Sequence, residues 1–367
     1  MKTVCDRNSC CGCGACLDVC PKDSIHLVKD YFTINAVIED NCINCKACKR
    51  VCPSINQVSK YKPIEWHQGW AKNDIRENAS SGGIASTIMQ NFINNGGSVA
   101  ACIFDSGKFL FKITDDIEQI KYFAGSKYVK SEPKGIYKQI EQTLKIKPVL
   151  FIGLPCQVAA VKLHFRNIDN LYTIDLICHG TPNIQVLSKF LKEKKYELNT
   201  IKDITFRKKK SEKNSYIKIE KCIDDYMLAF LYSICYTNNC YECKYAEIER
   251  VSDITLGDSW GTELTDELKN GISLILVQNL KGQELLKDCE ITLKPVNMDI
   301  AIKHNQQLER PVQVTKARRL FVENINKGRS FSYSTIRAIP EAVFIQKVKK
   351  FINKESKNNP FGLSILK

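Results

Sequence analysis

Long hydrophobic segments are missing from this sequence of 367 residues. No uninterrupted apolar run reaches the roughly 18 residues that a membrane-spanning helix needs. No charged start followed by an apolar stretch opens the chain, as it would in a secretory signal. The sequence therefore predicts no membrane span and a cytoplasmic location, in which thiols stay reduced. In that setting, clustered cysteines indicate metal binding rather than disulfides.

A nucleic-acid-binding pattern is also missing, although the formal net charge is +14. The densest basic run lies at residues 207–213, without interleaved aromatic side chains or a recognised nucleic-acid motif. Such runs are usually solvent-facing loops. We therefore expect no nucleic-acid partner. The positive charge suits phosphates, an anionic cofactor or an acidic redox protein.

Cysteine, by contrast, is abundant, with 18 in the chain. The pattern C-x2-C-x2-C-x3-C-P occurs twice within the first 60 residues. This is the ligand spacing of a protein with two [4Fe–4S] clusters, in which the last cysteine of each run binds the other run's cluster. The predicted ligand sets are Cys10, Cys13, Cys16 and Cys52 for one cluster, and Cys42, Cys45, Cys48 and Cys20 for the other.

Zinc is the alternative for these cysteines, but zinc sites usually use C-x2-C pairs separated by a longer spacer. The crowding of each run, with a proline after its last cysteine, favours iron–sulfur chemistry. Residues 24–41 alternate apolar and polar side chains, as a short hairpin does. Residues 1–60 are therefore expected to form an α+β, ferredoxin-like dicluster domain. Cys5 and Cys11 have no predicted partner.

After a polar linker at residues 58–62, the sequence predicts alternating strands and helices, and hence an α/β core with parallel pairing. Buried strands are predicted at 99–104, 148–152, 171–177 and 272–277. Helices are predicted at 84–92, 157–165, 184–195, 283–287 and 341–352. The expected divisions are 61–145 and 146–310 for the two parts of this core, and 311–367 for a basic helical tail.

Two of the predicted strands lead into cysteines, Cys156 and Cys178, and a C-x2-C pair follows at Cys240 and Cys243. Ligands commonly bind at the carboxyl ends of parallel strands. These four cysteines are therefore candidates for a third [4Fe–4S] cluster. Zinc stays open for this set, and a lone buried cysteine is often only a small apolar residue.

Two glycine-containing turns are further candidate sites. The stretch S-S-G-G at 80–83 precedes a helix, where free backbone N–H groups favour phosphate, although an ordinary helix cap is the simpler explanation. The stretch 250–261 ends in a turn with Asp258 and Trp260, which are candidates for contact with a flavin or its substrate. A tight turn with a packed tryptophan is the alternative.

The order of these pieces resembles the beta-subunit family of coenzyme F420-reducing hydrogenases and dehydrogenases. The matching stretches are S-S-G-G at 80–83, G-S-K-Y at 125–128, G-L-P-C-Q at 153–157, D-L-I-C-H-G at 175–180, C-Y-E-C-K-Y-A at 240–246, R-V-S-D-I-T-L-G-D-S-W-G at 250–261 and G-I-S-L-I-L-V at 271–277. Leu154 departs from the family pattern, in which threonine is frequent, and lysines follow Arg207 where tryptophan often occurs.

The resemblance implies an α/β flavin-binding domain that holds FAD, with a cluster on Cys156, Cys178, Cys240 and Cys243. The flavin contacts that it implies are Ser81, Gly82, Gly83, Ser126 and Lys127. A flavin couples one-electron carriers to a two-electron substrate. The expected function is that of an iron–sulfur flavoprotein oxidoreductase, which passes electrons between a ferredoxin-like protein or redox-enzyme subunit and a small molecule. Coenzyme F420 is one candidate for that substrate.

His179 and Asp258 are the candidate catalytic residues, as proton donors to a reduced substrate. For His179, orienting a cluster sulfur or bonding to the backbone is the alternative. Two other functions stay open for the whole chain. One is a non-catalytic electron-relay subunit of a larger redox complex, and the other is a zinc-bound interaction module.

Overall fold

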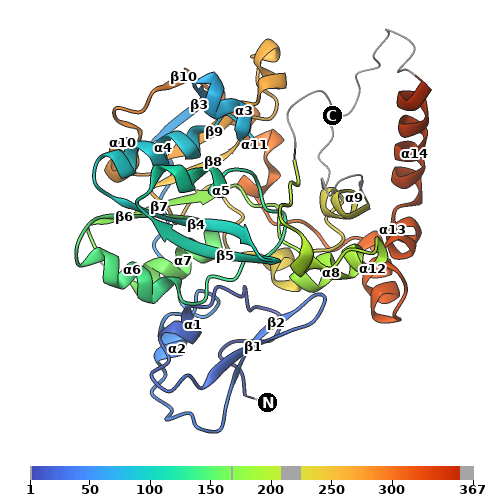
Figure 1. Ribbon diagram of the computed structural model, residues 1–367, viewed down its shortest axis with the longest axis horizontal. Helices are drawn as coiled ribbons and strands as arrows, with labels where there is room; N and C mark the ends of the chain where they lie inside the picture. Colours follow the sequence, from blue (N-terminus) through green and yellow to red (C-terminus); the bar gives the residue numbers. More distant parts are fainter. Residues whose placement is uncertain (1, 167, 208–224, 356–367) are drawn as a thin grey trace.

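The computed structural model describes residues 2–166, 168–207 and 225–355 (Figure 1). Within these residues, an eight-stranded mixed sheet forms the centre, in the order β10-β3-β9-β8-β7-β6-β4-β5. The N-terminal unit, residues 2–60, lies beside the sheet rather than within it (Figure 1). The strands of the sheet are β3 Glu65–Ala71, β4 Ser98–Asp105, β5 Lys108–Thr114, β6 Val149–Gly153, β7 Leu171–Leu176, β8 Ile254–Asp258, β9 Ser273–Val277 and β10 Ile291–Pro295.

The centre of the sheet confirms the predicted parallel pairing, because β4, β6, β7 and β8 are parallel neighbours. Strand β6 is buried along its whole length, as expected for an apolar run with both faces covered. Side chains on one face of β6 pack against α6 and α7, and those on the other pack against α4, α5 and α10. The helices around the sheet are α3 Asn73–Asn78, α4 Ile84–Asn94, α5 Ile120–Phe123, α6 Ile136–Leu144, α7 Pro155–His164, α10 Leu280–Leu286 and α11 Met298–His304.

The outer strands pair antiparallel, which the sequence did not predict. Strand β5 pairs with β4, and β3 lies between β9 and β10, all in antiparallel register. The sequence of β3, EWHQGWA, has no apolar run. Its buried Gln68 instead accepts hydrogen bonds from the hydroxyls of Ser259 and Thr262, at 3.0 and 2.6 Å. Since both expected core segments, 61–145 and 146–310, contribute strands to this sheet, they share one core.

The N-terminal unit contains the expected hairpin. Strands β1 (Ile25–Lys29) and β2 (Ile34–Ile38) pair antiparallel between the two cysteine runs. Short helices, α1 (Ala15–Asp18) and α2 (Ala47–Arg50), include the third cysteine of each run and begin just after the second. Both begin after a residue in the left-handed conformation, Gly14 and Lys46, which turns the chain sharply around the cysteine side chains.

Several contacts attach this unit to the sheet domain. The Asp18 carboxylate accepts the backbone N–H groups of Gly135, at 2.8 and 2.9 Å, and of Tyr137, at 3.2 Å, at the start of α6. The Tyr137 hydroxyl donates to the Cys13 carbonyl at 2.8 Å. The expected linker is fixed as well, because Tyr61 and Arg250 exchange two backbone hydrogen bonds.

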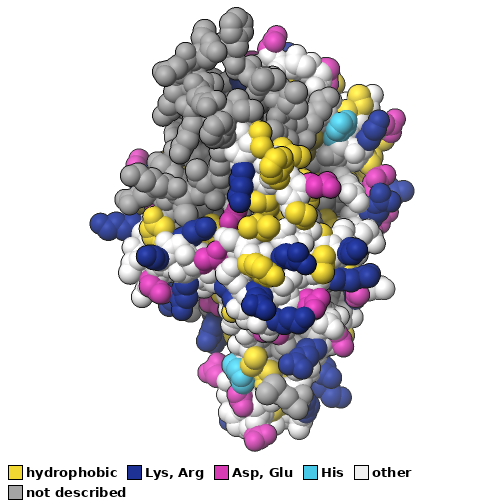
Figure 2. All heavy atoms as spheres, turned by 90° about the vertical axis from the view of Figure 1, so that its right-hand side faces the viewer, with side chains coloured by type: hydrophobic (Ala, Val, Ile, Leu, Met, Phe, Trp, Pro, Cys, Tyr) yellow, Lys and Arg dark blue, Asp and Glu magenta, His cyan; other side chains and the backbone are white. Residues whose placement is uncertain are grey.

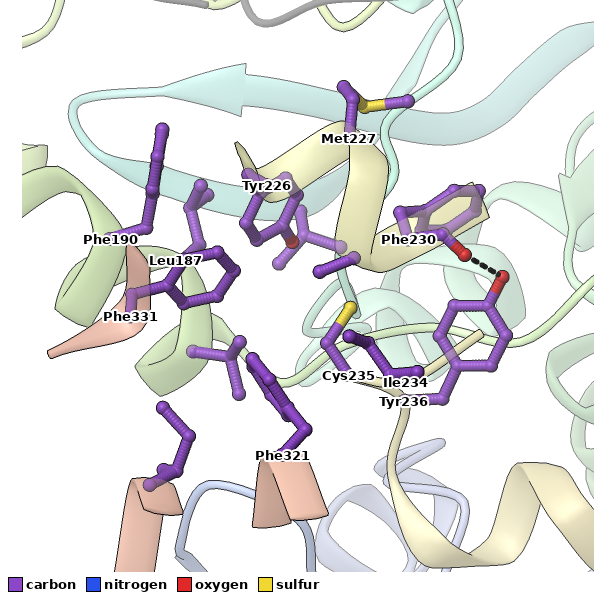
Figure 3. Close-up of a cluster of buried hydrophobic side chains, with 14 of the residues drawn as sticks. Leu187, Phe190, Tyr226, Met227, Phe230, Ile234, Cys235, Tyr236, Phe321 and Phe331 are labelled. Carbon is purple, nitrogen blue, oxygen red and sulfur yellow. Dashed lines mark hydrogen bonds between the residues drawn. The ribbon is translucent and has the colours of Figure 1, made fainter. Parts of the chain in front are cut away.

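The C-terminal helices pack on an aromatic core, part of which is drawn in Figure 3. Phe109 of β5 belongs to the same core. The rings of Phe190, Phe321 and Phe331 meet edge to face, with centroids 5.2 and 5.5 Å apart for the two pairs that Phe331 makes. The Tyr236 hydroxyl donates to the Phe230 carbonyl at 2.7 Å, just before the segment that carries Cys240 (Figure 3). The helices involved are α8 Ile184–Glu193, α9 Asp225–Leu231, α12 Lys316–Asn326, α13 Phe331–Ala338 and α14 Pro340–Glu355.

The helices of the described residues are all too short or too polar to cross a membrane. On the face that includes this helical region, Lys and Arg side chains are interspersed with Asp and Glu (Figure 2).

A buried charge network joins the central strands to the segment that follows Cys243. Arg250, 2% exposed, lies 3.1 Å from the Asp175 carboxylate of β7. Its guanidinium also donates to Thr255 Oγ1 of β8 at 3.2 Å and to the Tyr245 carbonyl at 2.9 Å. Thr255 completes the network by donating to Asp175 at 2.6 Å. These bonds fix the backbone that follows the C-x2-C pair against the central strands.

We predict that Arg250→Met lowers the free energy of unfolding by about 3–5 kcal/mol, because it leaves the buried Asp175 carboxylate without its cation. Urea denaturation under anaerobic conditions measures the change. Arg337→Met, at an exposed position, is the matched control and should change stability by less than about 0.5 kcal/mol. A loss below about 1 kcal/mol in Arg250→Met would contradict the cost of breaking a buried ion pair.

We also predict that Asp18→Ala lowers the free energy of unfolding by about 2 kcal/mol, because N–H groups at the start of α6 lose their acceptor. Hydrogen exchange should quicken at Gly135 and Tyr137 and stay unchanged in β6. Asp18→Asn keeps an acceptor oxygen and should lose less than half as much. Equal exchange rates in the wild type and Asp18→Ala would contradict this attachment.

Candidate functional site

The ligand sets expected for the first 60 residues each line a separate hollow. Cys10, Cys13, Cys16 and Cys52, here called site I, line one hollow of about 310 Å³, including the part open to solvent. Cys20, Cys42, Cys45 and Cys48, here called site II, line another. Its volume is also about 310 Å³, measured in the same way, although only Cys48 of site II is buried, whereas Cys13, Cys16 and Cys52 of site I are. Each hollow combines three cysteines of one run with the last cysteine of the other, as the dicluster spacing requires.

Backbone geometry shapes both hollows. Gly12 has a φ of 68°, and a Cβ at that position would lie 2.8 Å from the Ile34 side chain. At site II, the backbone N–H of Ser24 donates to Cys20 Sγ at 3.3 Å, and that of Asn44 donates to Cys42 Sγ at 3.4 Å. Such N–H groups stabilise negative charge on sulfur. Cys45 is exposed, so site II is open to solvent on that side.

The two cysteines without an expected partner lie beside site I. Cys5 hydrogen-bonds with Cys10 and Cys52, which raises its pKa. Cys11 is buried, and hydrogen bonds with Cys13 and Cys156 lower its pKa. Cys11 therefore connects a site I cysteine with one from the sheet domain. No local sequence pattern could have indicated a contact between segments so far apart in the chain.

The four cysteines of the expected third set, here called site III, also lie together. Cys156 is in the first turn of α7, Cys178 follows β7, and Cys240 and Cys243 lie in and just after the 3₁₀ turn Asn238–Glu242. Burial is the main cause that raises the pKa of Cys178 to about 12, and the charges of Cys240 and Cys243 add to it. Burial is also the main cause that raises the pKa of Cys243 to about 11, with a smaller contribution from Cys240. The thiolates of these two residues therefore need a metal or cation to exist at neutral pH.

The three sites do not have the geometry of a single-ion site. Among the described residues, no three His, Cys, Asp or Glu side chains surround a point that could hold one metal ion. A zinc ion would need its sulfurs about 2.3 Å from such a point. At sites I and II the cysteines are arranged around a hollow, which suits a group larger than one ion. At all three sites a set of thiolates alone is the usual ligand chemistry of iron–sulfur clusters.

A lysine lies within site III. Lys130 is 6% exposed, and its Nζ donates to the Cys11 carbonyl at 3.3 Å. Burial alone would lower the pKa of Lys130, but the charges of Cys240, Cys156, Cys11 and Cys178 outweigh it, so the pKa is raised. A cation at this position fits a site that holds an anionic group.

The candidate catalytic residues occur at the same edge of the sheet. His179 directly follows Cys178, and Asp258 ends β8. His179 is exposed at the surface. Desolvation of its ring by neighbouring groups lowers its pKa, and the nearby Asp258 charge opposes this. An exposed imidazole is accessible to a small molecule.

Arg207 and Tyr128 lie near Asp258, although the sequence indicated a role for neither. These two residues, His179 and Asp258 are here called the His179 group. Arg207 lies 2.5 Å from the Asp258 carboxylate, and its guanidinium lies 5.5 Å from the centre of the Trp260 ring. Burial raises the pKa of Tyr128, whose hydroxyl hydrogen-bonds with Arg207 and Ser126. Tyr128 is the last residue of the G-S-K-Y stretch, and that stretch could have indicated a functional role for Tyr128. Arg207 opens the basic run that was interpreted as a solvated loop, and residues 208–224, which include the rest of that run, lie outside the described residues.

The expected flavin contacts come together in two touching loops. The Ser126 backbone N–H donates to Ser80 Oγ at 2.7 Å, so 80–83 and 125–128 are neighbours. Ser81 donates to the Ile272 carbonyl, and the Gly82 N–H donates to Ser273 Oγ, both at 2.9 Å. Gly83, with a φ of 87°, caps α4 without a side-chain hydrogen bond.

Lys127 is engaged differently from the other expected flavin contacts. Its Nζ donates to the carbonyls of Tyr122, Phe123 and Ala124, at 3.1, 2.8 and 2.9 Å. The ammonium group therefore closes the end of α5, and burial lowers the pKa of Lys127 to about 8. These bonds give Lys127 a structural role, because they fix the loop that carries Ser126 and Tyr128.

The comparisons with known proteins agree in part with this arrangement. Two family models of the coenzyme F420 hydrogenase/dehydrogenase beta subunit match: that of its N-terminal part at residues 66–134, and that of its C-terminal part at residues 146–298. A chain of the F420-reducing [NiFe] hydrogenase complex from Methanosarcina barkeri, determined with xenon, is similar in structure. Its TM-score is 0.46 at 18% identity, covering 74% of this chain and 97% of that chain. No curated protein matches the sequence.

The two family models are the halves of one beta subunit, and they match in their natural order. Together they span more than half of the chain. They begin after the N-terminal unit and end at the start of α11, so sites I and II lie outside them and the site III cysteines lie inside. The chain belongs to the coenzyme F420 hydrogenase/dehydrogenase beta-subunit family.

Proposed function

We propose that this chain is an iron–sulfur flavoprotein oxidoreductase that exchanges electrons between a redox protein and a two-electron organic substrate. Its family is one of oxidoreductases. The observation that carries the proposal is the order of the three cysteine sites. Apolar packing joins site II to site I through Cys48 and Cys52, and joins site I to site III through Cys13 and Cys156.

The order of the three sites also indicates where electrons would enter and leave the chain. Site II has the exposed Cys45, whereas Cys13 and Cys240, in sites I and III, are buried. A redox-protein partner would therefore meet the chain at site II, and a small molecule would meet it at the His179 group beside site III. When bound, [4Fe–4S] clusters supply one-electron transfer, and FAD links it to two-electron chemistry.

The chain's own residues would hold and orient these groups. The thiolates of sites I, II and III are the proposed ligands. The loops 80–83 and 125–128 are the proposed flavin contacts, through Ser81, Gly82, Gly83 and Ser126, whereas the ammonium group of Lys127 is occupied at α5. His179 and Asp258 are the proposed proton donors to that small molecule. Coenzyme F420 is the first substrate to test, because the family is named for it.

We predict about twelve irons and one flavin per chain in anaerobically prepared protein, from three clusters of four irons. Cys178→Ala should lower the iron content to about eight, because it removes a ligand of site III only. Cys289→Ala is the matched control, since Cys289 lies outside all three sites, and should keep the wild-type iron content. Iron, acid-labile sulfide and flavin analyses measure these values. About eight irons in the wild type would contradict a cluster at site III, and zinc in place of iron would identify a zinc-bound module.

We predict that the reduced chain turns over with F420 or another two-electron acceptor, and that His179→Ala lowers kcat by about 100-fold or more through loss of a proton donor. Asp258→Asn should lower it by at least about tenfold. His26→Ala, at an exposed pair with Glu39 on the hairpin, is the control and should leave kcat unchanged. Iron content must stay constant in each variant, because His179 adjoins Cys178.

The same assay separates the enzyme from the relay alternative. Reduction of the iron–sulfur chromophores without turnover of F420, nicotinamide or viologen would contradict the enzyme. It would identify the chain as an electron-relay subunit that acts only when bound to a catalytic partner.

A further inference from the structure

Lys130 is held between the segments that carry sites I and III. Its backbone N–H donates to the Pro182 carbonyl at 2.9 Å, in the loop that follows Cys178. Its Nζ reaches the Cys11 carbonyl on the other side. Next to it, Ser131 Oγ accepts a hydrogen bond at 2.9 Å from Gln157, the neighbour of Cys156. Three separate contacts thus determine where the ammonium group lies.

The charge of Lys130 has no carboxylate partner within the described part of the chain. The charged groups that act on it most strongly are the cysteines of site III and Cys11. The nearby acidic side chain of Glu132 forms an ion pair with Lys29 instead. An isolated buried ammonium is costly. Among the described residues, the negative charge that faces it is therefore that of Cys11 and of site III, where four thiolates and an oxidised cubane would together carry a charge of about −2.

Two other buried cations near site III are already engaged. The guanidinium of Arg250 pairs with Asp175 at 3.1 Å. Arg318 donates to the Ile234 carbonyl at 2.7 Å and to Asn238 Oδ1 at 3.1 Å, and it stacks on the Phe32 ring. Arg250 and Arg318 thus each bind a polar side chain. Of these three cations in the described part of the chain, Lys130 is the one whose charged group binds no polar side chain.

We infer that Lys130 is a positioning residue that raises the reduction potential of a cluster at site III. A cluster that gains one electron becomes more negative, and a nearby positive charge stabilises that reduced form more than the oxidised form. The net charge and hydrogen bonds around a cluster are the established determinants of its potential. The effect would make site III the favoured acceptor of an electron that arrives at site I. This inference rests on the proposed function, since it requires a cluster at site III.

An EPR-monitored redox titration of the full iron-loaded chain tests the inference. The signal of site III is identified as the one that Cys178→Ala removes. Lys130→Met and Lys130→Gln both remove the charge, and the glutamine keeps a hydrogen-bond donor. Each should shift the one-electron equilibrium of site III at least tenfold toward the oxidised form, which is about 59 mV. The signals of site II should not shift.

Lys134→Met is the matched control, because Lys134 lies nearby in the chain but is exposed. The potential of site III in this variant should equal that of the wild type. A shift below threefold in either iron-loaded Lys130 variant would overturn the inference. Loss of about four irons from both variants would also overturn it, in favour of a role in holding the cluster. A wild-type chain with about eight irons and no signal lost in Cys178→Ala would instead overturn the cluster at site III, and the inference with it.

Discussion

The buried pair of Arg250 and Asp175 is the interaction on which the geometry of the sheet domain depends. It joins β7, β8 and the backbone at Tyr245, so it determines where Cys178 and Cys243 lie relative to each other. A buried ion pair contributes little net stability, but removing one partner is costly. The network is therefore better understood as a constraint on geometry than as a source of stability.

At site III, unlike at the Arg250–Asp175 pair, burial opposes the formation of charge. Burial raises the pKa of Cys178 and Cys243, so these thiols resist ionisation until a metal group neutralises them. The chain places cations where that negative charge would arise: Lys130 within site III, Arg250 beside Cys243 and Arg318 near Cys240. Folding of this region and assembly of its metal group would thus be coupled through charge.

Local patterns carried most of what could be predicted without the structure. The cysteine spacing indicated which residues share each N-terminal hollow, and apolar runs identified β6, β7 and β9. Strand β3 was missed because its sequence, with Gln68 at a buried position, has the polarity of a loop. The contact of Cys11 with Cys156 and the burial of Lys130 depend on tertiary packing alone. Nothing local distinguishes Lys130 from the other basic residues in a chain that has 54 lysines and arginines.

The anchoring of α1 to α6 has a consequence for the timing of the proposed electron transfer. Asp18 and Tyr137 tie the N-terminal unit to the sheet domain through hydrogen bonds beside site I. The gap between sites I and III is then a fixed distance rather than one that opens and closes as domains diffuse. The rate of electron transfer across this gap would therefore not depend on the viscosity of the solvent. The rate-limiting step would be the encounter with the external partner rather than a motion within the chain.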